Sequence, residues 1–212
     1  MTVAAVMTYD SLVDDLSTYL ERTDQATLDK IPTFIMLAEQ VIATELKFLG
    51  NLTVATSQMV PGQATIDKPA RWRKTVSLNV TVAGSRQPVL LRKYEYLREF
   101  WPNPTETDTP KFYCDYDYTH WLVAPTPDIA YNYEVLYYER AQPLDSSNQS
   151  NWFTQYAPQA MLYGSLLQAM PFLKNDERIP MWQAQYQQVI TTLQAEDITR
   201  VADRQSIVRD AS

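Results

Sequence analysis

The chain has 212 residues, a formal net charge of −7 and 45% hydrophobic residues. This hydrophobic content is enough to bury a sizeable core, so the composition argues against a disordered chain. The negative charge argues against a nucleic-acid grip, because neutralising phosphates requires clustered Lys and Arg. The single Cys excludes an internal disulfide and predicts assembly in a reducing cytoplasm, and the four Gly argue against phosphate-cradling loops.

A membrane location is not expected from the pattern of apolar residues. No apolar run approaches the roughly 20 residues that a helix needs to cross a bilayer. The first ten residues, MTVAAVMTYD, have neither a basic region nor a long apolar core. We therefore expect no signal peptide.

The first fifty residues predict a helical hairpin. Thr8 is a suitable N-cap for a helix that runs through Arg22, with Leu12 and Leu16 on its apolar stripe. After residues 23–29 a second helix is expected, with a proline in its first turn and a glycine as its stop signal. Its apolar residues recur at helical spacing as far as residue 49.

Residues 51–141 change period and predict a β-rich insertion. Residues 52–60 are strand-like, and Pro61-Gly62 predicts a type II turn. In TVSLNVTV, residues 75–82, apolar and polar residues alternate, as in a half-buried strand. A short helix is expected over 93–101. Strands follow at 111–117, 120–124 and 131–140, and their short connections favour an antiparallel meander.

The C-terminal third predicts a second helical hairpin over residues 142–204, followed by a flexible tail over 205–212. A polar linker at 142–150 leads into a helix capped by Ser150 or Asn151, and Pro158 restarts this helix after a kink. Ala160 and Gly164 are small residues four apart that would let another helix approach closely. The expected fold class is α+β, with a helical bundle built from both chain ends and an inserted antiparallel β-sheet module.

One helix opening is nearly repeated. Residues 30–44, KIPTFIMLAEQVIAT, and 178–192, RIPMWQAQYQQVITT, are identical at six of fifteen positions. A duplicated active-site element and a shared structural role are both compatible with this pattern. We favour convergence on a good helix start over a true duplication.

A charged turn near the C-terminus resembles a catalytic cluster. Lys174, Asp176, Glu177 and Arg178 fall within five residues. The alternative, which we favour, is that the acidic residues sit where a helix N-terminus attracts negative charge, with solvated cations beside them.

A second candidate cluster is Cys114, Asp115, Asp117 and His120. Strand alternation places Cys114 on one face and both aspartates on the other, which argues against a compact catalytic triad. The single His argues against zinc, and the aspartates lack a calcium-loop signature. Nucleotide-binding, serine-hydrolase and zinc-protease motifs are absent. We therefore predict no enzyme activity, no catalytic residues, no cofactor and no metal.

Aromatic residues crowd the predicted strands after residue 110. The set comprises Tyr113, Tyr116, Tyr118, Trp121, Tyr131, Tyr133, Tyr137 and Tyr138. Cross-strand aromatic pairs stabilise sheets without any ligand, but tyrosines on both faces exceed what one buried face needs. Because Tyr and Trp are enriched at protein interfaces, we predict a protein contact surface. Its predicted residues are Tyr113, Tyr116, Tyr118, Trp121, Tyr137 and Tyr138. A carbohydrate-binding or tail-decoration module built from the same rings is the alternative.

The outer thirds of the chain carry a family resemblance. The segments YYERAQPLDSSNQSNW, APQAMLYGSLLQA and DERIPMWQAQY, with DLSTYLERTDQATLDKIPTFIMLAEQVIATELK near the N-terminus, resemble the head-to-tail adaptor (connector) proteins of tailed bacteriophages, particularly short-tailed ones. This resemblance implies a structural virion protein of the neck that assembles as a dodecameric ring beneath the portal. Its implied partners are the portal protein, a nozzle or tail-tube protein, further copies of itself, and DNA that passes through the channel without specific binding.

The last residues, 197–212, alternate acidic and basic residues with β-branched ones between them. An ordinary frayed terminus is one interpretation. In an adaptor, the segment could instead order against the portal or a neighbouring subunit. We predict that Ile207, Val208 and Arg209 are mobile in the free protein and ordered in the assembled particle.

Overall fold

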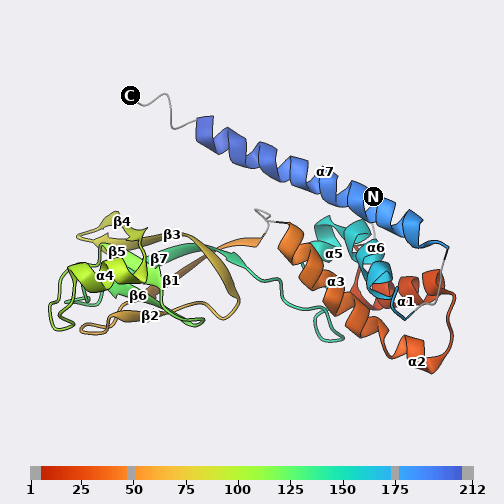
Figure 1. The fold of residues 1–212 in the computed structure, drawn as a ribbon, viewed down its shortest axis with the longest axis horizontal. Helices are drawn as coiled ribbons and strands as arrows, with labels where there is room; N and C mark the ends of the chain where they lie inside the picture. The colour runs from red at the N-terminus through yellow and green to blue at the C-terminus, as the bar shows by residue number, and fades with distance from the viewer. Residues whose placement is uncertain (1–5, 47–50, 173–176, 207–212) are drawn as a thin grey trace. The chain divides into compact units, whose positions relative to one another are not determined.

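The computed structural model of the chain describes residues 6–46, 51–172 and 177–206, with only the backbone of 197 and 199–206 (Figure 1). The chain divides into two compact units. One is a helical unit made from Met1–Asn51 and Ala141–Ser212, and the other is a sheet unit, Leu52–Arg140. Each unit has its own hydrophobic core.

The helical unit contains a series of short helices and one long one. They are α1 (Tyr9–Leu20), α2 (Gln25–Leu28), α3 (Ile31–Glu45), α5 (Trp152–Tyr156), α6 (Pro158–Gln168) and α7 (Ile179–Ser206). Thr8 caps α1, because its hydroxyl accepts the Ser11 amide proton, and Asn151 caps α5 in the same way. Both predicted caps are confirmed. Asp24, which caps the unpredicted helix α2, was not anticipated.

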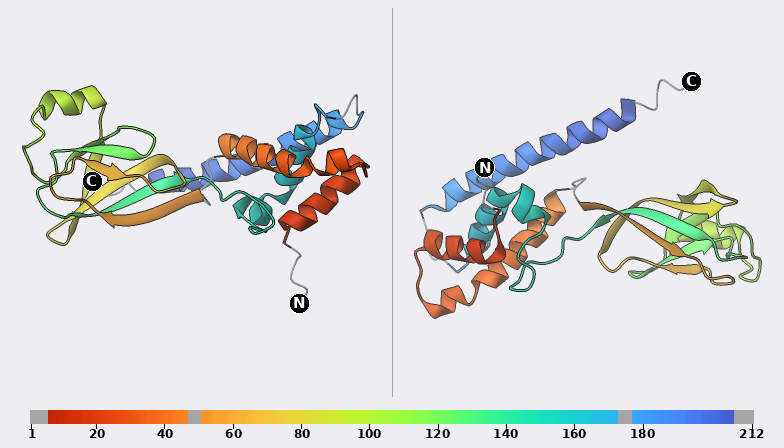
Figure 2. Two further views of the ribbon diagram at one scale, coloured as in Figure 1. Left: turned by 90° about the horizontal axis from the view of Figure 1, so that it is seen from below. Right: turned by 180° about the vertical axis from the view of Figure 1, so that it is seen from behind.

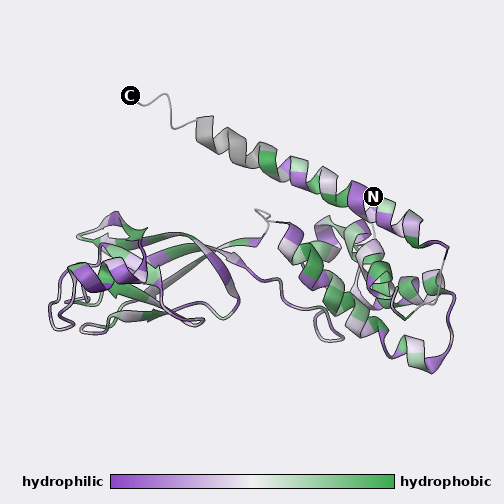
Figure 3. Cartoon of the chain, viewed as in Figure 1, coloured by the Kyte–Doolittle hydropathy of each residue, from purple (hydrophilic) through white to green (hydrophobic). Residues whose placement is uncertain are grey.

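Helix α6 lies at the centre of this unit and packs against α1, α3, α5 and α7. Hydrophobic residues run along α3 and α6 (Figure 3). The fully buried residues include Leu12 and Leu16 of α1, Ile42 of α3 and Leu166 of α6. Trp182, on the first turns of α7, is also buried, whereas Ile198 further along that helix is 70% exposed.

The two similar helix openings begin α3 and α7, and both helices lie against α6. Helices α3 and α7 both approach α6 at Gly164. A Cβ atom at this position would lie 3.2 Å from Tyr186 of α7 and 3.5 Å from Ala38 of α3. Ala38 and Tyr186 occupy the same position in the aligned repeats. The expected close approach at Gly164 is confirmed, and the repeats share a structural role.

We expect Gly164→Val to lower the free energy of unfolding by about 1–3 kcal/mol, because the added methyl groups have no room between Tyr186 and Ile42. Chemical denaturation followed by circular dichroism measures the change. Gln159→Val, at an exposed position of the same helix, controls for helix propensity. Equal stability of the two variants would contradict the close approach.

The segment 141–151 is held to the helical unit by a buried carboxylate. Glu39 of α3 is only 7% exposed. Its carboxylate accepts hydrogen bonds from the Leu144 amide at 3.3 Å and from the Asn151 side-chain amide at 2.6 Å. The predicted polar linker, 142–150, is therefore anchored to α3 through Leu144 and through Asn151, the residue that follows it.

The sheet unit contains seven strands and helix α4 (Tyr94–Phe100). The strands are β1 (Leu52–Gln58), β2 (Thr65–Asp67), β3 (Trp72–Val82), β4 (Ser85–Leu91), β5 (Phe112–Asp115), β6 (His120–Ala124) and β7 (Asn132–Glu139). Their order is β1-β7-β3-β4-β5-β6-β2, and the sheet curls into a half-barrel (Figures 1 and 2). The first and last strands of the insertion pair directly, with Leu52 opposite Tyr138.

The chain is α+β, but the expected arrangement, a helical bundle from both chain ends with an antiparallel sheet module, is wrong. The sheet is mixed, because β4 and β5 pair in parallel. The helices α1, α3, α5 and α7 are grouped around α6 rather than arranged as two hairpins placed side by side. The expected meander is also wrong, since β7 pairs with β1 and β3 instead of β6.

Strands β5 and β6 alternate between two cores. Tyr113, Trp121 and Val123 point into the curl of the sheet, whereas Cys114 and Leu122 lie on its outer face. Leu97 of α4 covers that outer face, so α4 lies outside the curl next to β5 (Figure 2). The crossover containing α4 joins the parallel pair β4 and β5, as parallel pairing requires.

A register shift breaks the predicted alternation in β3. Thr75 pairs with Tyr137 and Ser77 pairs with Leu136, so Val76 is an extra residue with no place in the ladder. Leu78 and Val80 are buried as predicted, but Val76 is 47% exposed. The alternation of apolar and polar residues could not reveal the exposure of Val76, because the bulge changes the direction of the side chain without changing the sequence pattern.

Candidate interaction surfaces

Most of the aromatic side chains that the sequence singled out are buried inside the sheet unit. Tyr113, Trp121, Tyr131, Tyr133 and Tyr137 belong to its core. Tyr138 is half-buried. The curl of the sheet encloses one face, and these rings fill the enclosed space. They form no flat platform of the kind that stacks on sugar rings.

Two of the predicted interface residues, Tyr116 and Tyr118, lie in the turn between β5 and β6 and are 46% and 68% exposed. The other predicted positions Ile207, Val208 and Arg209 lie outside the described residues. Because only these two tyrosines of the predicted aromatic set are exposed, the aromatic surface is smaller than the sequence predicted.

A buried lysine organises the neighbourhood of this turn. The Lys68 side chain is 3% exposed, and its ammonium lies 3.1 Å from Asp115 Oδ1 and 3.9 Å from the centre of the Trp72 ring. It also donates a hydrogen bond to the Asp117 carbonyl at 2.6 Å. Asp115 is therefore the counter-ion of a buried cation rather than a metal ligand. No local sequence pattern marks Lys68, because the two aspartates that bind its ammonium are distant along the chain.

The carboxylate of Asp117 shapes the turn itself. It accepts the backbone amide protons of Thr119 and His120, each at 2.7 Å. The His120 ring lies between Asp117, at 2.9 Å, and Asp67, at 3.3 Å. The hydrogen bond from His120, followed by those from Thr119, holds the pKa of Asp117 far below its usual range. These contacts describe a stabilised turn.

Cys114 is separated from the polar groups of this turn. It is buried under α4, and burial raises the pKa of its thiol, with Asp115 as the next cause. A raised pKa opposes formation of the nucleophilic thiolate. Within residues 6–46, 51–172 and 177–206, no group of three His, Cys, Asp or Glu side chains is placed to hold a metal.

We expect Asp115→Ala, Asp117→Ala and His120→Ala to leave particle assembly and phage infectivity largely intact. Each carboxylate or imidazole is substantially exposed and serves the local turn. Asp115→Ala should lower the thermal midpoint most, because it removes the counter-ion of Lys68. Plaque counts and thermal melts measure these effects. A strong defect that added metal reverses would reveal a functional metal site.

The charged turn 174–178 is described only in part, since Lys174 and Asp176 lie outside the described residues. Arg178 donates a hydrogen bond to the Tyr19 carbonyl at 2.8 Å, at the C-terminal end of α1. Its guanidinium also lies over the Trp182 ring at 5.2 Å. A cation at a helix C-terminus is stabilising, so Arg178 ties the start of α7 to the end of α1.

An exposed tyrosine–arginine patch surrounds the β5–β6 turn. We define it as Tyr94, Arg98, Tyr116, Tyr118 and Arg140. The Tyr94 and Tyr116 rings stack at 6.1 Å, and the Arg98 guanidinium lies 5.0 Å from Tyr94. The Arg140 guanidinium lies 5.4 Å from the Tyr118 ring. The patch thus contains two groups that share the β5–β6 turn, one formed with α4 and one formed with Arg140 after β7. The sequence predicted only Tyr116 and Tyr118 among these residues.

The other flank of α4 is also aromatic. Tyr96 contacts Phe100 and Phe112, with ring centres 4.4 and 5.6 Å apart. Arg92 lies over Tyr96 at 5.8 Å, and Phe100 is 57% exposed. These contacts fix α4 on the sheet from the side opposite to the tyrosine–arginine patch.

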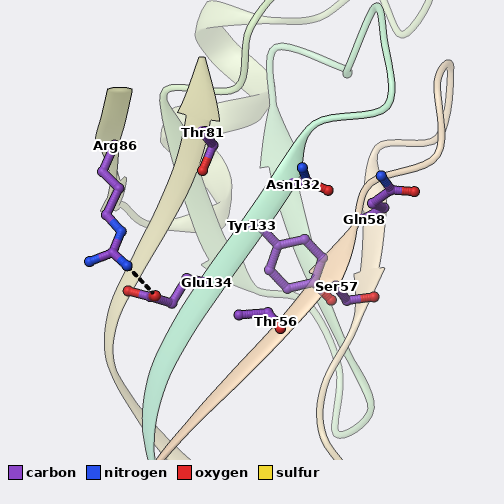
Figure 4. Close-up of a pocket in the computed structure, with 8 residues that line it drawn as sticks. All are labelled: Thr56, Ser57, Gln58, Thr81, Arg86, Asn132, Tyr133 and Glu134. Carbon is purple, nitrogen blue, oxygen red and sulfur yellow. Dashed lines mark ion pairs between the residues drawn. The ribbon is translucent and has the colours of Figure 1, made fainter. Parts of the chain in front are cut away.

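A polar hollow of about 530 Å³ lies on the sheet where β1, β3, β4 and β7 meet (Figure 4). It is lined by Thr56, Ser57, Gln58, Thr81, Arg86, Asn132, Tyr133 and Glu134. Arg86 and Glu134 form an ion pair at 2.9 Å across its rim, so their charges are already neutralised. The hollow presents hydroxyl and amide groups but no concentrated charge.

A family model described as SU10 adaptor protein matches residues 7–209. The chain belongs to the SU10 adaptor protein family. The match confirms the resemblance to phage adaptors, and it includes the sheet unit, where the sequence segments showed little likeness. The curated proteins that were searched gave no match.

This SU10 adaptor-family protein is therefore a bacteriophage adaptor, a structural component of the virion. Membership of an adaptor family implies interaction with portal and tail components in general. Across the described helices, none combines the length and the hydropathy needed to cross a bilayer.

Proposed function

We propose that the protein is the head-to-tail adaptor of a short-tailed phage. Twelve copies form a ring between the portal and the tail, and this ring extends the DNA channel. The portal protein lies on one side, and a nozzle or tail-tube protein lies on the other. The observation that supports the proposal is the adaptor-family match, which runs through both units of the chain.

The charge of the chain supports a channel that lets DNA pass. A net charge of −7 repels phosphates, so DNA is not held while it moves through the ring. A protein that acts only by assembling into such a ring needs no catalytic residue. Fluorescence anisotropy with labelled duplex DNA should show no binding by the free chain at physiological salt.

Mixing the purified chain with rings of the portal protein tests the proposal directly. Electron microscopy should show a second ring stacked on the portal, and native mass spectrometry should give twelve added copies. Portal rings that stay bare at a large excess of the chain would contradict the proposal. A stable ring with a number of copies other than twelve would agree with the adaptor role but contradict the dodecamer.

We expect deletion of residues 205–212 to preserve the fold but to weaken attachment to the portal. The deleted segment includes the positions proposed to become ordered on assembly, Ile207, Val208 and Arg209. A variant in which the same residues are replaced by Gly and Ser controls for length. Attachment is measured by co-sedimentation with portal rings. Wild-type attachment of both variants would identify this segment as an ordinary frayed terminus.

A further inference from the structure

The arginines of the tyrosine–arginine patch are held in place but not neutralised. Arg98 donates a hydrogen bond to the Tyr94 hydroxyl at 3.0 Å, and Arg140 stacks on Tyr118. Among the residues that the structure describes, neither guanidinium has a carboxylate within salt-bridge distance. Exposed Tyr and Arg side chains with fixed orientations are the residue types that dominate binding energy at protein interfaces.

The charges of the chain are distributed unequally between its two units. Ten basic side chains balance ten acidic ones in Leu52–Arg140, so the whole net charge of −7 belongs to the helical unit. Residues 9–29, which contain α1 and α2, carry six acidic residues and one basic residue, Arg22. The helical unit is therefore the acidic part of the molecule.

The face of α1 that points to solvent concentrates part of this charge. Asp10, Asp14 and Asp15 are all exposed, and none has a cation within salt-bridge distance in the described parts of the chain. Asp10 and Asp14 lie one turn apart, where like charges destabilise a helix. We name these three residues the acidic α1 face. Asp10 lies in the first turn of α1, where the helix dipole favours a negative charge, whereas Asp14 and Asp15 lie beyond that turn.

We propose that the tyrosine–arginine patch of one copy binds the acidic α1 face of a second copy. The inference rests on the proposed ring and names the contact that closes it. Two different surfaces of one chain that complement each other make a head-to-tail contact, which closes into a ring when the rotation between copies allows. Arg98 and Arg140 supply the positive groups, Asp14 and Asp15 the negative ones, and the tyrosines supply contact area.

Charge reversal tests this contact in rings assembled on the portal protein. Arg98→Glu/Arg140→Glu and Asp14→Arg/Asp15→Arg should each reduce ring assembly about tenfold or more, because each places like charges opposite one another. Combining all four substitutions in one chain should restore assembly. Lys74→Glu, a charge reversal at an exposed position of the sheet unit outside the patch, is the control and should assemble normally. Circular dichroism confirms that each variant is folded.

The alternatives give different results. Unchanged assembly by both double variants overturns the inference. Loss that the fourfold variant does not restore, with weaker binding of the Arg98→Glu/Arg140→Glu variant to the tail protein, assigns the patch to that protein and also overturns the inference.

Disulfide cross-linking tests the contact even without a ring. Chains with Tyr118→Cys mixed with chains with Asp14→Cys should form a heterodimer on mild oxidation, and the native Cys114 is buried and should contribute little background. Ser146→Cys in place of Asp14→Cys, at another exposed site of the helical unit, should not cross-link. Equal cross-linking by both pairs, or by neither, refutes the contact. Failure of the wild-type chain to assemble on the portal refutes the proposed function instead.

Discussion

Replacing Ile42 or Leu166 with Ala lowers the free energy of unfolding by about 2–5 kcal/mol in each case. Both side chains are fully buried in the helical core, Ile42 on α3 and Leu166 on α6. Truncation leaves a cavity in addition to the lost transfer free energy, because the surrounding helices are held by their own contacts with α6.

Chemical denaturation monitored by far-ultraviolet circular dichroism measures both variants. Ile198→Ala removes the same atoms as Ile42→Ala from a position that is 70% exposed, so it should change the stability by less than about 0.5 kcal/mol. If the two core variants were as stable as Ile198→Ala, the packing of α3 and α6 described above would be incorrect.

Replacing Glu39 with Ala should cost about 2–6 kcal/mol, because the Leu144 amide and the Asn151 side-chain amide each lose a buried acceptor. An unsatisfied buried donor costs about 1–3 kcal/mol. Asn151 also caps α5, so its displacement would weaken that helix as well. Glu39→Gln keeps an acceptor oxygen and should lose much less.

The same carboxylate makes stability depend on pH. Burial raises the pKa of Glu39 from 4.5 to about 6, although the hydrogen bonds from Leu144 and Asn151 oppose this, and Asp145 contributes a further increase. The folded state therefore binds the proton more tightly than the unfolded state. Its contribution to stability is fully present below pH 4.5 and is lost as the pH rises through about 6, by roughly 2 kcal/mol in total.

Denaturation curves between pH 4 and pH 8 test this sign. The wild-type chain should lose the stability that Glu39→Gln retains over this interval, so the difference between the two chains isolates Glu39 from other titrating groups. Parallel curves for the two chains would show that Glu39 titrates with the same pKa in the folded and unfolded states.

The sequence predicted where helices and strands form more accurately than which strands pair with one another. The Thr8 cap, the Ile-Pro helix starts, and the strand pattern around Leu78 and Val80 each come from local physics, and each element forms there. Strand pairing is not local. Nothing in the period of β5 reveals that β4 will lie beside it in parallel, since the connection through α4 determines that arrangement.

For the candidate surface too, the sequence indicated individual residues but not the contacts between elements. The sequence marked Tyr116 and Tyr118, but it also marked Tyr113, Trp121 and Tyr137, because a strand pattern cannot show that a sheet curls around its aromatic residues. Arg98 and Arg140 were missed for a related reason. Arg140 contacts Tyr118, which is distant along the chain. Arg98 contacts Tyr94 on the same helix, α4, and this pair joins the turn only because Tyr94 stacks on Tyr116.

The pairing of Leu52 with Tyr138 has a consequence for the order of folding. The helical unit is assembled from two chain segments that the whole sheet unit separates, and closing a loop of that length costs about 4 kcal/mol of chain entropy. When β1 and β7 pair first, formation of the sheet unit already closes this loop, before the helical unit forms. The incoming α5, α6 and α7 then find α1 and α3 as though a short loop joined them. Synthesis in the N-to-C direction favours this sequence, because the sheet unit is complete before α6 leaves the ribosome.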